Sequence, residues 1–489
     1  MAEEEVKETF NIDKEKNFPE WFSEICKVAE LADLRYNVKG FVVYRPWAVI
    51  AMKLMYKFYE KALEKRGHKP VIFPAVIPES NFKKEAEHVE GFAPEVFWIT
   101  EHGAGEKFEE KIALRPTSET AMYSMFSLWV RSYKDLPLKT YQSCQVWRYE
   151  TKATKAFLRT REFYWIESHD VFATLKEAED QVKEDMEITK EVLHDIFGIP
   201  FIFFQRPEWD KFAGAIHTYA ADAFMPSGRV SQLPSTHLLG QNFSKPFNIK
   251  FVDKDERENF AYQTCYGPCI SRIFGALISV HGDNKGLKFP WKISPLQVII
   301  VPIIYKGKER QVLEKCDELK GKLEKAEIRV DIDKTDKTPG EKFYFWEMKG
   351  VPLRLEIGPE EVEKNTITAF RRDTENKEKI KESELIEWVK KTGEEYDKNL
   401  IEKADEGFKN IIVEANSYEE LKNAIENKKM VKIPFCSVDM DGEPCAEKIK
   451  EEMKAEVRGI RMDKKETPKG NCVVCGKKAN CVVYVAKQY

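Results

Sequence analysis

One stretch of the sequence restricts the fold more than any other, because it combines a strand pattern with a strong local charge. Residues 146–150 and 157–169 are rich in aromatic and other apolar side chains on either side of a short turn, which predicts an antiparallel β-hairpin. The segment 148–161 contains five Lys or Arg residues and one Glu, in a chain whose net charge is -4. Because Arg binds phosphate oxygens through a planar fork, this loop predicts a phosphate ligand. The alternative is a solvated surface hairpin.

The second predicted strand indicates what lies beside the basic loop. Trp165, Glu167 and His169 are spaced two residues apart, so they share one face of a strand. An aromatic ring, a carboxylate and an imidazole on the same face predict the wall of a pocket.

The rest of the chain divides by composition into three predicted domains, which is compatible with 489 residues at roughly 100 to 200 residues per domain. Residues 1–290 are rich in Trp, as expected for a large domain with a pocket. Residues 291–400 begin with strand, helix and strand patterns at 296–305, 308–325 and 328–332, which predict a small α/β domain. Residues 401–489 contain half of the 10 cysteines.

Charge and hydropathy exclude two classes of protein. A net charge of -4 and a pI near 6.2 leave no global basic field, so any polyanion must bind to local patches. The longest strongly apolar stretch, residues 298–305, is far shorter than the roughly twenty residues that span a bilayer. Residues 1–8 are acidic and have no apolar core, so we expect no export signal and predict a cytoplasmic protein.

Two helices are predicted in the first domain. Residues 46–66 carry apolar side chains at helical spacing, and residues 69–73 follow as a strand that ends at Pro74. A second helix is predicted to begin at Thr117. Thr117 and Glu119 therefore have a purely structural interpretation, as the N-cap and the first-turn acid of this helix.

The cysteines of the third domain have the spacing of metal ligands. Cys472 and Cys475 are separated by two residues, and Cys436 with Cys445 offers a second pair. In a chain without an export signal, two such pairs predict a closed, structural Zn²⁺ site of four thiolates. The gap between Cys436 and Cys445 is longer than usual, so Cys481 remains an alternative ligand.

Together with four further motifs, the basic hairpin resembles the second motif of class II aminoacyl-tRNA synthetases, and within them that of the prolyl enzymes of archaeal and eukaryotic type. Residues 46–74 look like the first motif, which builds the dimer interface of the family, and residues 263–276 resemble the third. Residues 114–119 and 237–244 are similar to stretches of the prolyl and closely related enzymes.

The resemblance covers nearly the whole chain and implies an α+β fold. Residues 1–290 would form a class II catalytic domain on an antiparallel sheet, residues 291–400 an α/β anticodon-binding domain, and residues 401–489 a zinc-binding α/β domain. The implied reaction is attack of the proline carboxylate on the α-phosphate of ATP, release of pyrophosphate, and transfer of proline to the 3′ end of tRNA. Such a step needs positioning and cations rather than a covalent nucleophile.

The resemblance also assigns roles in binding ATP. Arg148 would clamp the α-phosphate and the substrate carboxylate, while Arg159 and Arg272 would hold the outer phosphates; these three are the predicted catalytic residues. Glu150 would lie beside adenine. Mg²⁺ would accompany ATP, held by acidic side chains that the sequence does not identify. The predicted ATP contacts are Arg148, Glu150, Arg159, Gln232, Ser235 and Arg272.

Proline carries a charged secondary amine and an apolar ring, so its pocket needs an acid and an aromatic cup. Thr117 and Glu119 resemble the residues that take the amine. In the third motif, Cys265 and Cys269 stand where the commoner version of this turn has Ser or Thr. The predicted proline contacts are Thr117, Glu119, Trp165, Glu167, His169, Phe212 and His237.

Residues 338–358 are similar to the anticodon-binding domain of this subclass. Glu347 and Arg354 would read guanines of a proline anticodon, and Arg371 and Arg372 would suit its phosphates. The alternative is a surface ion-pair network.

The resemblance implies as partners tRNA(Pro), proline, ATP and a second copy of the chain in a homodimer. Only 95 residues separate Glu167 from Gln263, where bacterial relatives insert an editing domain, so we expect no editing within the chain. Misactivation of cysteine or alanine is then expected, with correction by a separate protein. Relatives also end in a tyrosine like Tyr489, which packs toward the active site.

Two other functions remain open at this stage. One is a ligase of the same subclass, such as a threonyl or glycyl enzyme, which would share the ATP contacts but not the pocket. The other is a synthetase-like module that binds tRNA without activating an amino acid. The presence of Arg148, Glu150, Arg159 and Arg272 argues against the second, because such a module is expected to lose its phosphate clamp.

Overall fold

The computed structural model describes residues 10, 12–88, 96–151 and 153–489. The acidic segment 1–8, on which the prediction of no export signal was based, lies outside this range. Among the described helices, none combines the length and the apolar character needed to cross a bilayer.

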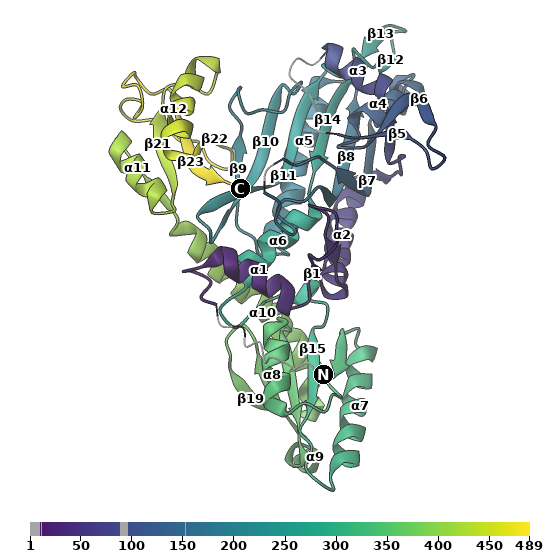
Figure 1. Cartoon of the computed structure of the whole chain (residues 1–489), viewed down its shortest axis with the longest axis vertical. Helices are drawn as coiled ribbons and strands as arrows, with labels where there is room; N and C mark the ends of the chain where they lie inside the picture. Colours follow the sequence, from purple (N-terminus) through teal and green to yellow (C-terminus); the bar gives the residue numbers. More distant parts are fainter. Residues whose placement is uncertain (1–9, 11, 89–95, 152) are drawn as a thin grey trace.

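In the described part of the chain, the largest feature is a sheet of 11 strands (Figure 1). The predicted hairpin lies near one edge of this sheet: β7 (Leu138–Trp147) and β8 (Glu162–Phe172) pair antiparallel, with Cys144 opposite Trp165. The sheet order from this side is β3 (Lys69–Pro70), β7, β8, β14 (Tyr262–Gly267), β11 (Arg229–Gly240), β10 (His217–Met225) and β9 (Ile202–Gln205).

Helices cover one face of this sheet and bury its core (Figure 1). In α2 (Pro46–Lys65), the buried Ala48, Met52, Met55, Tyr59 and Leu63 recur every three or four residues, as the sequence predicted. They pack in one cluster with α1 (Phe18–Val28) and α6 (Ile270–His281). Each large apolar side chain buried here stabilises the fold by roughly 1.5–3 kcal/mol relative to exposure.

Several predicted element boundaries are wrong. The hairpin strands predicted at 146–150 and 157–169 are Leu138–Trp147 and Glu162–Phe172, so residues 148–150 and 157–161 lie outside them. The strand predicted for residues 69–73 ends at Pro70, because the chain leaves the sheet and exposes 96% of Ile72 to solvent. The helix predicted to begin at Thr117 is α4 (Glu119–Trp129), and its N-cap is Ser118. Thr117 is therefore not the cap, and its side chain is available to the pocket.

The small α/β domain is confirmed. Its sheet has the order β16 (Val330–Ile332), β15 (Val298–Pro302), β17 (Leu353–Ile357), β18 (Thr366–Arg371) and β19 (Lys377–Lys381). Strands β16, β15 and β17 are parallel, with α7 (Glu309–Lys325) and α8 (Pro339–Met348) as their connections. The domain lies at one end of the molecule, below the main sheet in Figure 1.

The C-terminal strands join the main sheet instead of forming a sheet of their own. Strand β22 (Glu456–Arg461) pairs with β9, and β23 (Cys481–Gln488) touches β11 in a parallel pairing of Val230 with Gln488. Strands β21 (Met430–Phe435) and β20 (Ile412–Glu414) complete this edge. Helix α10 (Leu385–Lys409) runs across the predicted domain boundary at 400/401. This boundary and the one predicted at 290/291 stay predictions.

A buried ion pair connects the small α/β domain to the catalytic domain. The Arg372 guanidinium is fully buried and donates to both oxygens of Asp283 at 2.6 and 2.9 Å. Lys288 lies 2.7 Å from the same carboxylate. The prediction that Arg372 contacts tRNA phosphates is therefore wrong, because its guanidinium is buried and already donates to groups inside the protein. Arg371 is also engaged, with Asp373 and Glu395.

We predict that Asp283→Ala lowers the free energy of unfolding by about 3 kcal/mol, because it leaves Arg372 buried without a partner. Burial raises the pKa of Asp283, but Arg372 and Lys288 outweigh it and hold the pKa well below its usual range. The stabilisation is thus fully present above the unfolded pKa of about 4 and is lost only as pH falls toward the lower folded value. Denaturant unfolding at pH 7 and pH 3 measures both effects.

The matched control is Asp180→Ala, which removes an exposed ion pair with Lys176 and Lys183. It is expected to change stability by less than about 1 kcal/mol. Equal effects of the two substitutions would contradict a special role for Asp283.

Candidate active site

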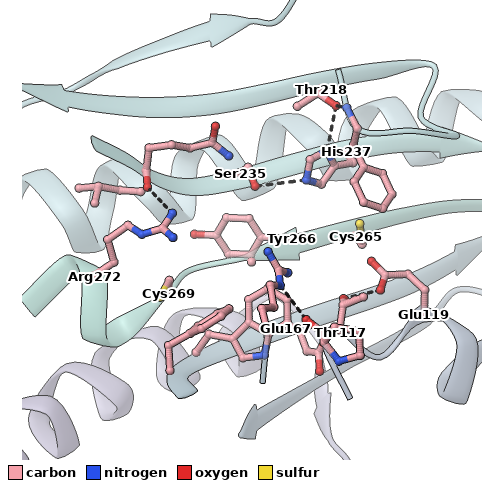
Figure 2. A pocket seen from close by; sticks show the side chains of 18 of the residues that line it. Thr117, Glu119, Glu167, Thr218, Ser235, His237, Cys265, Tyr266, Cys269 and Arg272 are labelled. Carbon is pink, nitrogen blue, oxygen red and sulfur yellow. Dashed lines mark hydrogen bonds between the residues drawn. The ribbon is translucent and has the colours of Figure 1, made fainter. Parts of the chain in front are cut away.

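A cavity of about 500 Å³ lies on the main sheet and collects nearly all of the predicted site residues (Figure 2). It is lined by side chains from β8, β10, β11, β14, the start of α4 and the start of α6. The predicted residues that line it are Thr117, Glu119, Arg148, Glu150, Trp165, Glu167, His169, Phe212, Gln232, Ser235, His237 and Arg272. Strand periodicity predicted Trp165, Glu167 and His169 as one wall, and the structure places all three there.

Arg159 lines a smaller adjoining cavity of about 70 Å³, together with Arg148, Glu150 and Arg272. Its guanidinium lies 3.8 Å from the Glu150 carboxylate and donates to the main-chain oxygen of Tyr489. The two cavities share Arg148, Glu150 and Arg272, so the predicted phosphate-binding arginines form one continuous group.

Glu167 is the most heavily hydrogen-bonded acid of the cavity. Its carboxylate accepts from the Ser118 N–H at 3.2 Å, the Ser118 hydroxyl, and the Gln142 amide at 2.8 Å. His169 Nε2 lies 3.2 Å away. Glu167 is therefore committed to positioning the wall of the cavity.

The protonation of this pair follows from its contacts. Burial raises the pKa of Glu167, but hydrogen bonds from His169, Ser118 and Gln142 outweigh it and leave the pKa lowered. Burial lowers the pKa of His169, yet Glu167 and the nearby Glu119 outweigh it and leave the pKa raised. The pair is thus arranged to keep a negative carboxylate beside an imidazole that favours its cationic form.

Glu119 is a second buried acid of the cavity, with fewer hydrogen-bond donors than Glu167. It is buried at the first turn of α4, and one of its oxygens accepts from the Thr117 hydroxyl. In Figure 2 the two side chains lie together at the end of the cavity opposite Arg272. A ligand that spans the cavity therefore meets negative charge at one end and positive charge at the other.

His237 forms an uncharged part of the cavity lining. Its Nδ1 lies 2.9 Å from the Thr218 hydroxyl and its Nε2 lies 3.2 Å from the Ser235 hydroxyl. Burial, with Arg206 and His169 nearby, lowers the pKa of His237 to about 3. The ring of Phe212 packs on it at 4.9 Å between centroids, which gives the cavity an apolar surface.

Arg148 and Arg272 place two like charges close together. The Arg148 guanidinium donates to the Pro116 carbonyl at 3.0 Å and lies over the rings of Phe163 and Trp165. Burial and then the charge of Arg272 lower the pKa of Arg148. Because two neighbouring cations repel each other, an anion bound between them is favoured.

Several residues of the site were missed from the sequence. Ser118, Gln142 and Tyr123 hold Glu167 and His169 in place, and Thr218 holds His237. Gln142 lies directly opposite Glu167 in the observed pairing of β7 with β8, but it is outside the strand predicted at 146–150, so the predicted hairpin did not indicate it. Cys265, Cys269 and Gly267 line the floor, and a Cβ at Gly267 would lie 3.3 Å from the Trp165 ring, so the absence of a side chain there makes room for the indole.

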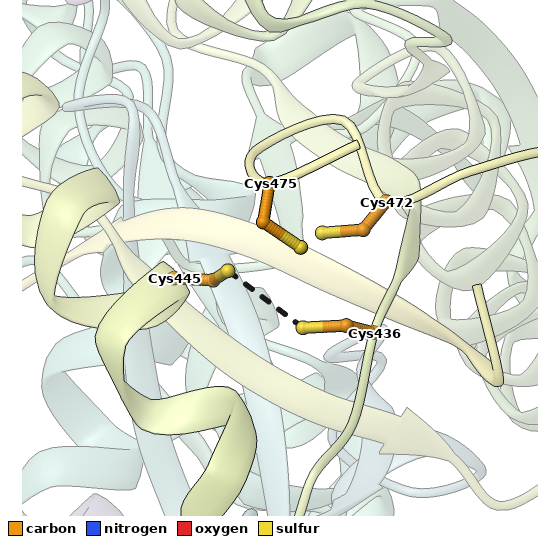
Figure 3. A group of neighbouring side chains, drawn as sticks. All are labelled: Cys436, Cys445, Cys472 and Cys475. Atoms are coloured by element: carbon orange, nitrogen blue, oxygen red, sulfur yellow. Dashed lines mark hydrogen bonds between the residues drawn. The ribbon is translucent and has the colours of Figure 1, made fainter. Parts of the chain in front are cut away.

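The four predicted metal ligands converge in the C-terminal part of the chain (Figure 3). The sulfurs of Cys436, Cys445, Cys472 and Cys475 lie within 4.8 Å of one another. Gly476, with φ +75°, turns the chain so that both Cys472 and Cys475 point to the same centre. Cys481 is outside this group, and its thiol lies 3.5 Å from the Phe435 carbonyl.

The two predicted anticodon readers contact each other. Arg354 on β17 is 3% exposed and donates to Glu347 at 2.6 Å and to Glu356 at 3.0 Å. Its guanidinium lies between the rings of Phe343 and Phe370, at 3.9 and 4.2 Å. The more exposed member of the pair is Glu347 on α8, whose side chain is 22% exposed.

Three family models match successive parts of the chain. The model described as the class II tRNA synthetase core domain (G, H, P, S and T) matches residues 97–281. The anticodon binding domain matches residues 297–392, and the C-terminal domain of prolyl-tRNA synthetase matches residues 418–489.

Whole-chain comparisons agree with these matches. The proline–tRNA ligase of Thermofilum pendens is 52% identical over 481 residues, which cover 98% of both chains. The proline–tRNA ligase of Pyrococcus abyssi is 43% identical over 479 residues, which cover 97% of this chain and 98% of the other. Among solved structures, the Giardia lamblia prolyl-tRNA synthetase in complex with prolyl-adenylate superposes with a TM-score of 0.94 at 38% identity, over 98% of this chain and 100% of that one. The Cryptosporidium parvum enzyme complexed with L-proline and AMP gives 0.92 at 33% identity, over 100% and 99%.

Proposed function

The chain belongs to the prolyl-tRNA synthetases of class II, and on this premise we propose which of its residues bind each substrate. It activates proline with ATP to prolyl adenylate, releases pyrophosphate, and transfers proline to tRNA. The observation that carries the assignment of residues is the charge separation within one cavity, with Glu119 at one end and Arg272 at the other, while Arg148 also lines the cavity.

Arg148 acts on the reacting phosphate. Its guanidinium is held by the Pro116 carbonyl and by two aromatic rings, so it is oriented before the substrates bind. In the displacement, negative charge grows on the α-phosphate oxygens, and a preoriented cation in a water-poor site stabilises that charge strongly. Arg272 and Arg159 hold the remaining phosphates and the departing pyrophosphate.

Glu119 and Thr117 bind the proline amine. Glu119 is negative, buried and close to the apolar surface of Phe212 and Trp165. This combination suits a ring that carries one cationic nitrogen. Glu167 and His169 act indirectly, because their hydrogen bonds fix the wall against which the ring packs.

Mg²⁺ enters with ATP, since it neutralises phosphate charge and prefers carboxylate and water oxygens. Four acidic side chains line the cavity, namely Glu119, Glu150, Glu167 and Asp210. Glu167 is committed to its donors and Glu119 faces the proline end, so Glu150 and Asp210 are the proposed magnesium ligands.

Glu347 reads the anticodon, and Arg354 positions it. A carboxylate accepts hydrogen bonds from the N1–H and N2–H groups of guanine, whereas the donors of Arg354 already face Glu347 and Glu356. This refines the prediction that both residues contact bases.

The four-cysteine cluster fits a structural zinc ion. Zinc binds thiolate at about 2.3 Å in a tetrahedron, which requires sulfur–sulfur separations of about 3.8 Å. The sulfurs of Cys436 and Cys445 lie 3.7 Å apart, and all four are within 4.8 Å. With four protein ligands and no open position, the ion would hold the loop at Cys472 against β21 and α12 (Glu443–Met453).

Two partners follow from surfaces and chemistry. Exposed apolar side chains at Ile72, Leu128 and Trp129 lie at or next to the first motif, which suits a second copy of the chain in a homodimer.

A pocket shaped for proline cannot strongly reject alanine or cysteine by fit, so a separate editing protein is the proposed source of correction.

We predict that Glu119→Gln raises KM for proline by roughly 30-fold or more and changes KM for ATP much less, because a charge-assisted bond of about 2 kcal/mol is lost. Proline-dependent exchange of pyrophosphate into ATP measures both constants without tRNA. With wild-type protein and all twenty amino acids, proline is expected to have the highest kcat/KM. A preference for threonine or glycine would support the alternative ligase, and an equal rise of both KM values would remove the amine role of Glu119.

We predict that Arg354→Ala lowers kcat/KM for charging of proline tRNA by at least about tenfold, because Glu347 loses the partner that orients it. Pyrophosphate exchange should stay unchanged, since the adenylate site is in another domain. Arg310→Ala is the control, because Arg310 is an exposed residue of the same domain that pairs only locally with Glu314. A parallel loss of exchange activity would show that Arg354 supports the fold.

We predict about one Zn²⁺ per chain, and its loss in Cys472→Ser together with a lower unfolding temperature. Cys481→Ser is the matched control, because Cys481 lies outside the cluster and should leave the zinc content unchanged. Elemental analysis of dialysed protein gives the stoichiometry. Retention of zinc by Cys472→Ser with loss in Cys481→Ser would reverse the ligand assignment.

A further inference from the structure

A strand of the C-terminal segment reaches the catalytic sheet through a buried charge. Arg458 on β22 is fully buried, and its Nε donates to Asp222 Oδ2 at 2.7 Å. Asp222 lies on β10, which belongs to the class II core, and is also fully buried. The contact joins residues 236 positions apart in the sequence.

A second arginine, which belongs to the class II core, also donates to Asp222. Arg206, directly after β9, donates to Asp222 Oδ2 at 2.9 Å and to Oδ1 at 2.7 Å. Burial raises the pKa of Asp222, but Arg206 and Arg458 outweigh it and lower the pKa to about 2. Asp222 is therefore a permanent anion that fixes the positions of two guanidinium groups.

Arg206 connects Asp222 to a residue that lines the cavity. Its Nη2 also donates to Gln232 Oε1 at 3.0 Å, and Gln232 lies directly opposite Asp222 in the pairing of β10 with β11. Because a guanidinium can only donate, the Gln232 amide must turn its oxygen to Arg206. Its N–H groups then serve as donors for the cavity, which Gln232 lines.

Gln232 is connected to the phosphate-binding arginines as well. Its main-chain oxygen accepts from Arg272 Nη1 at 3.1 Å. Gln232 thus accepts one hydrogen bond from Arg206 on its side chain and one from Arg272 on its main chain. A shift of Gln232 would disturb two of the proposed ATP contacts together.

We infer that Arg206, Asp222 and Arg458 are positioning residues for ATP, which orient Gln232 and through it Arg272, so that ATP affinity depends on a strand of the C-terminal segment. The inference rests on the proposed function in one respect, namely that Gln232 contacts ATP. None of the three residues lines the 500 Å³ cavity, so they do not touch the nucleotide. Arg206 Nε also lies 3.8 Å from Asp210, which lines the cavity, but its hydrogen bond to Gln232 is the shorter contact.

Stability alone does not account for this arrangement. Buried ion pairs are often replaced by apolar residues of similar volume at no loss of stability, because the attraction barely exceeds the cost of desolvating both charges. Apolar residues cannot supply a hydrogen-bond donor at a fixed position, and Arg206 uses such a donor for its bond to Gln232.

The test compares Arg206→Lys and Arg458→Lys, which keep a positive charge beside Asp222, by pyrophosphate exchange. Lysine has one nitrogen in place of the guanidinium fork, so in Arg206→Lys it cannot hold Asp222 and Gln232 in the present geometry. KM for ATP is expected to rise about tenfold, which corresponds to one oriented hydrogen bond, and KM for proline to change by less than about twofold. Arg458→Lys should act in the same direction with a smaller effect.

The control is Arg461→Lys, on the same strand, where the arginine pairs with the exposed Asp463. It should leave both KM values and the unfolding temperature unchanged. A merely structural role of Arg206 would lower the unfolding temperature without separating KM for ATP from KM for proline.

The double variant Arg206→Lys/Gln232→Ala decides whether the effect passes through Gln232. If it does, the double variant is no worse for ATP than Gln232→Ala alone. Additive effects, or equal rises of both KM values in Arg206→Lys, would overturn the positioning role. An unchanged KM for ATP in Gln232→Ala would instead show that Gln232 does not contact ATP, and would overturn the proposed contact and the inference together.

Discussion

The arrangement of the active site depends on one constraint, which is that a charge removed from water must be compensated by opposite charge or by several hydrogen bonds. Glu167 satisfies it with donors from Ser118, Gln142 and His169. Asp222 satisfies it with two arginines. Among the described residues, the Arg148 guanidinium donates to a carbonyl and has Arg272 as a neighbouring charge. The proposed ATP phosphate would supply opposite charge to both arginines.

The same constraint explains how the parts of the molecule are joined. Arg372 and Asp283 compensate each other between the anticodon-binding and catalytic domains, and Arg458 and Asp222 do so between the C-terminal segment and the core. Neither pair could be separated without leaving a charge buried alone. The sheet shared by β9 and β22 adds main-chain hydrogen bonds to this connection. The C-terminal segment is thus part of the wall that supports the ATP site.

A comparison of Glu347 with Glu167 shows how an acid acquires its role. Both are held by cationic or hydroxyl partners, but Glu167 is enclosed and saturated, whereas Glu347 keeps part of its carboxylate at the surface. A saturated acid can only position its neighbours. A partly exposed acid whose orientation is fixed by an arginine can meet the edge of a base.

The sequence alone determined the local parts of this protein. The period of two in residues 157–169 placed Trp165, Glu167 and His169 on one wall, and the spacing of apolar residues predicted α2, because strands and helices impose these repeats on neighbours a few positions apart. The two-residue gap between Cys472 and Cys475 likewise indicated a shared centre. The family resemblance then supplied residues that local patterns could not, such as Phe212 and Gln232, both of which line the cavity.

Only the tertiary structure decided which charges compensate one another. Nothing in the sequence distinguishes Arg372, which is sealed against Asp283, from an arginine that binds phosphate, and nothing marks Arg206 or Arg458 as partners of Asp222. Partners separated by 16, 89 and 236 positions are brought together by the packing of strands and domains. The free energy of a buried charge depends on that packing, so the roles of these arginines could not be derived from residue type and spacing.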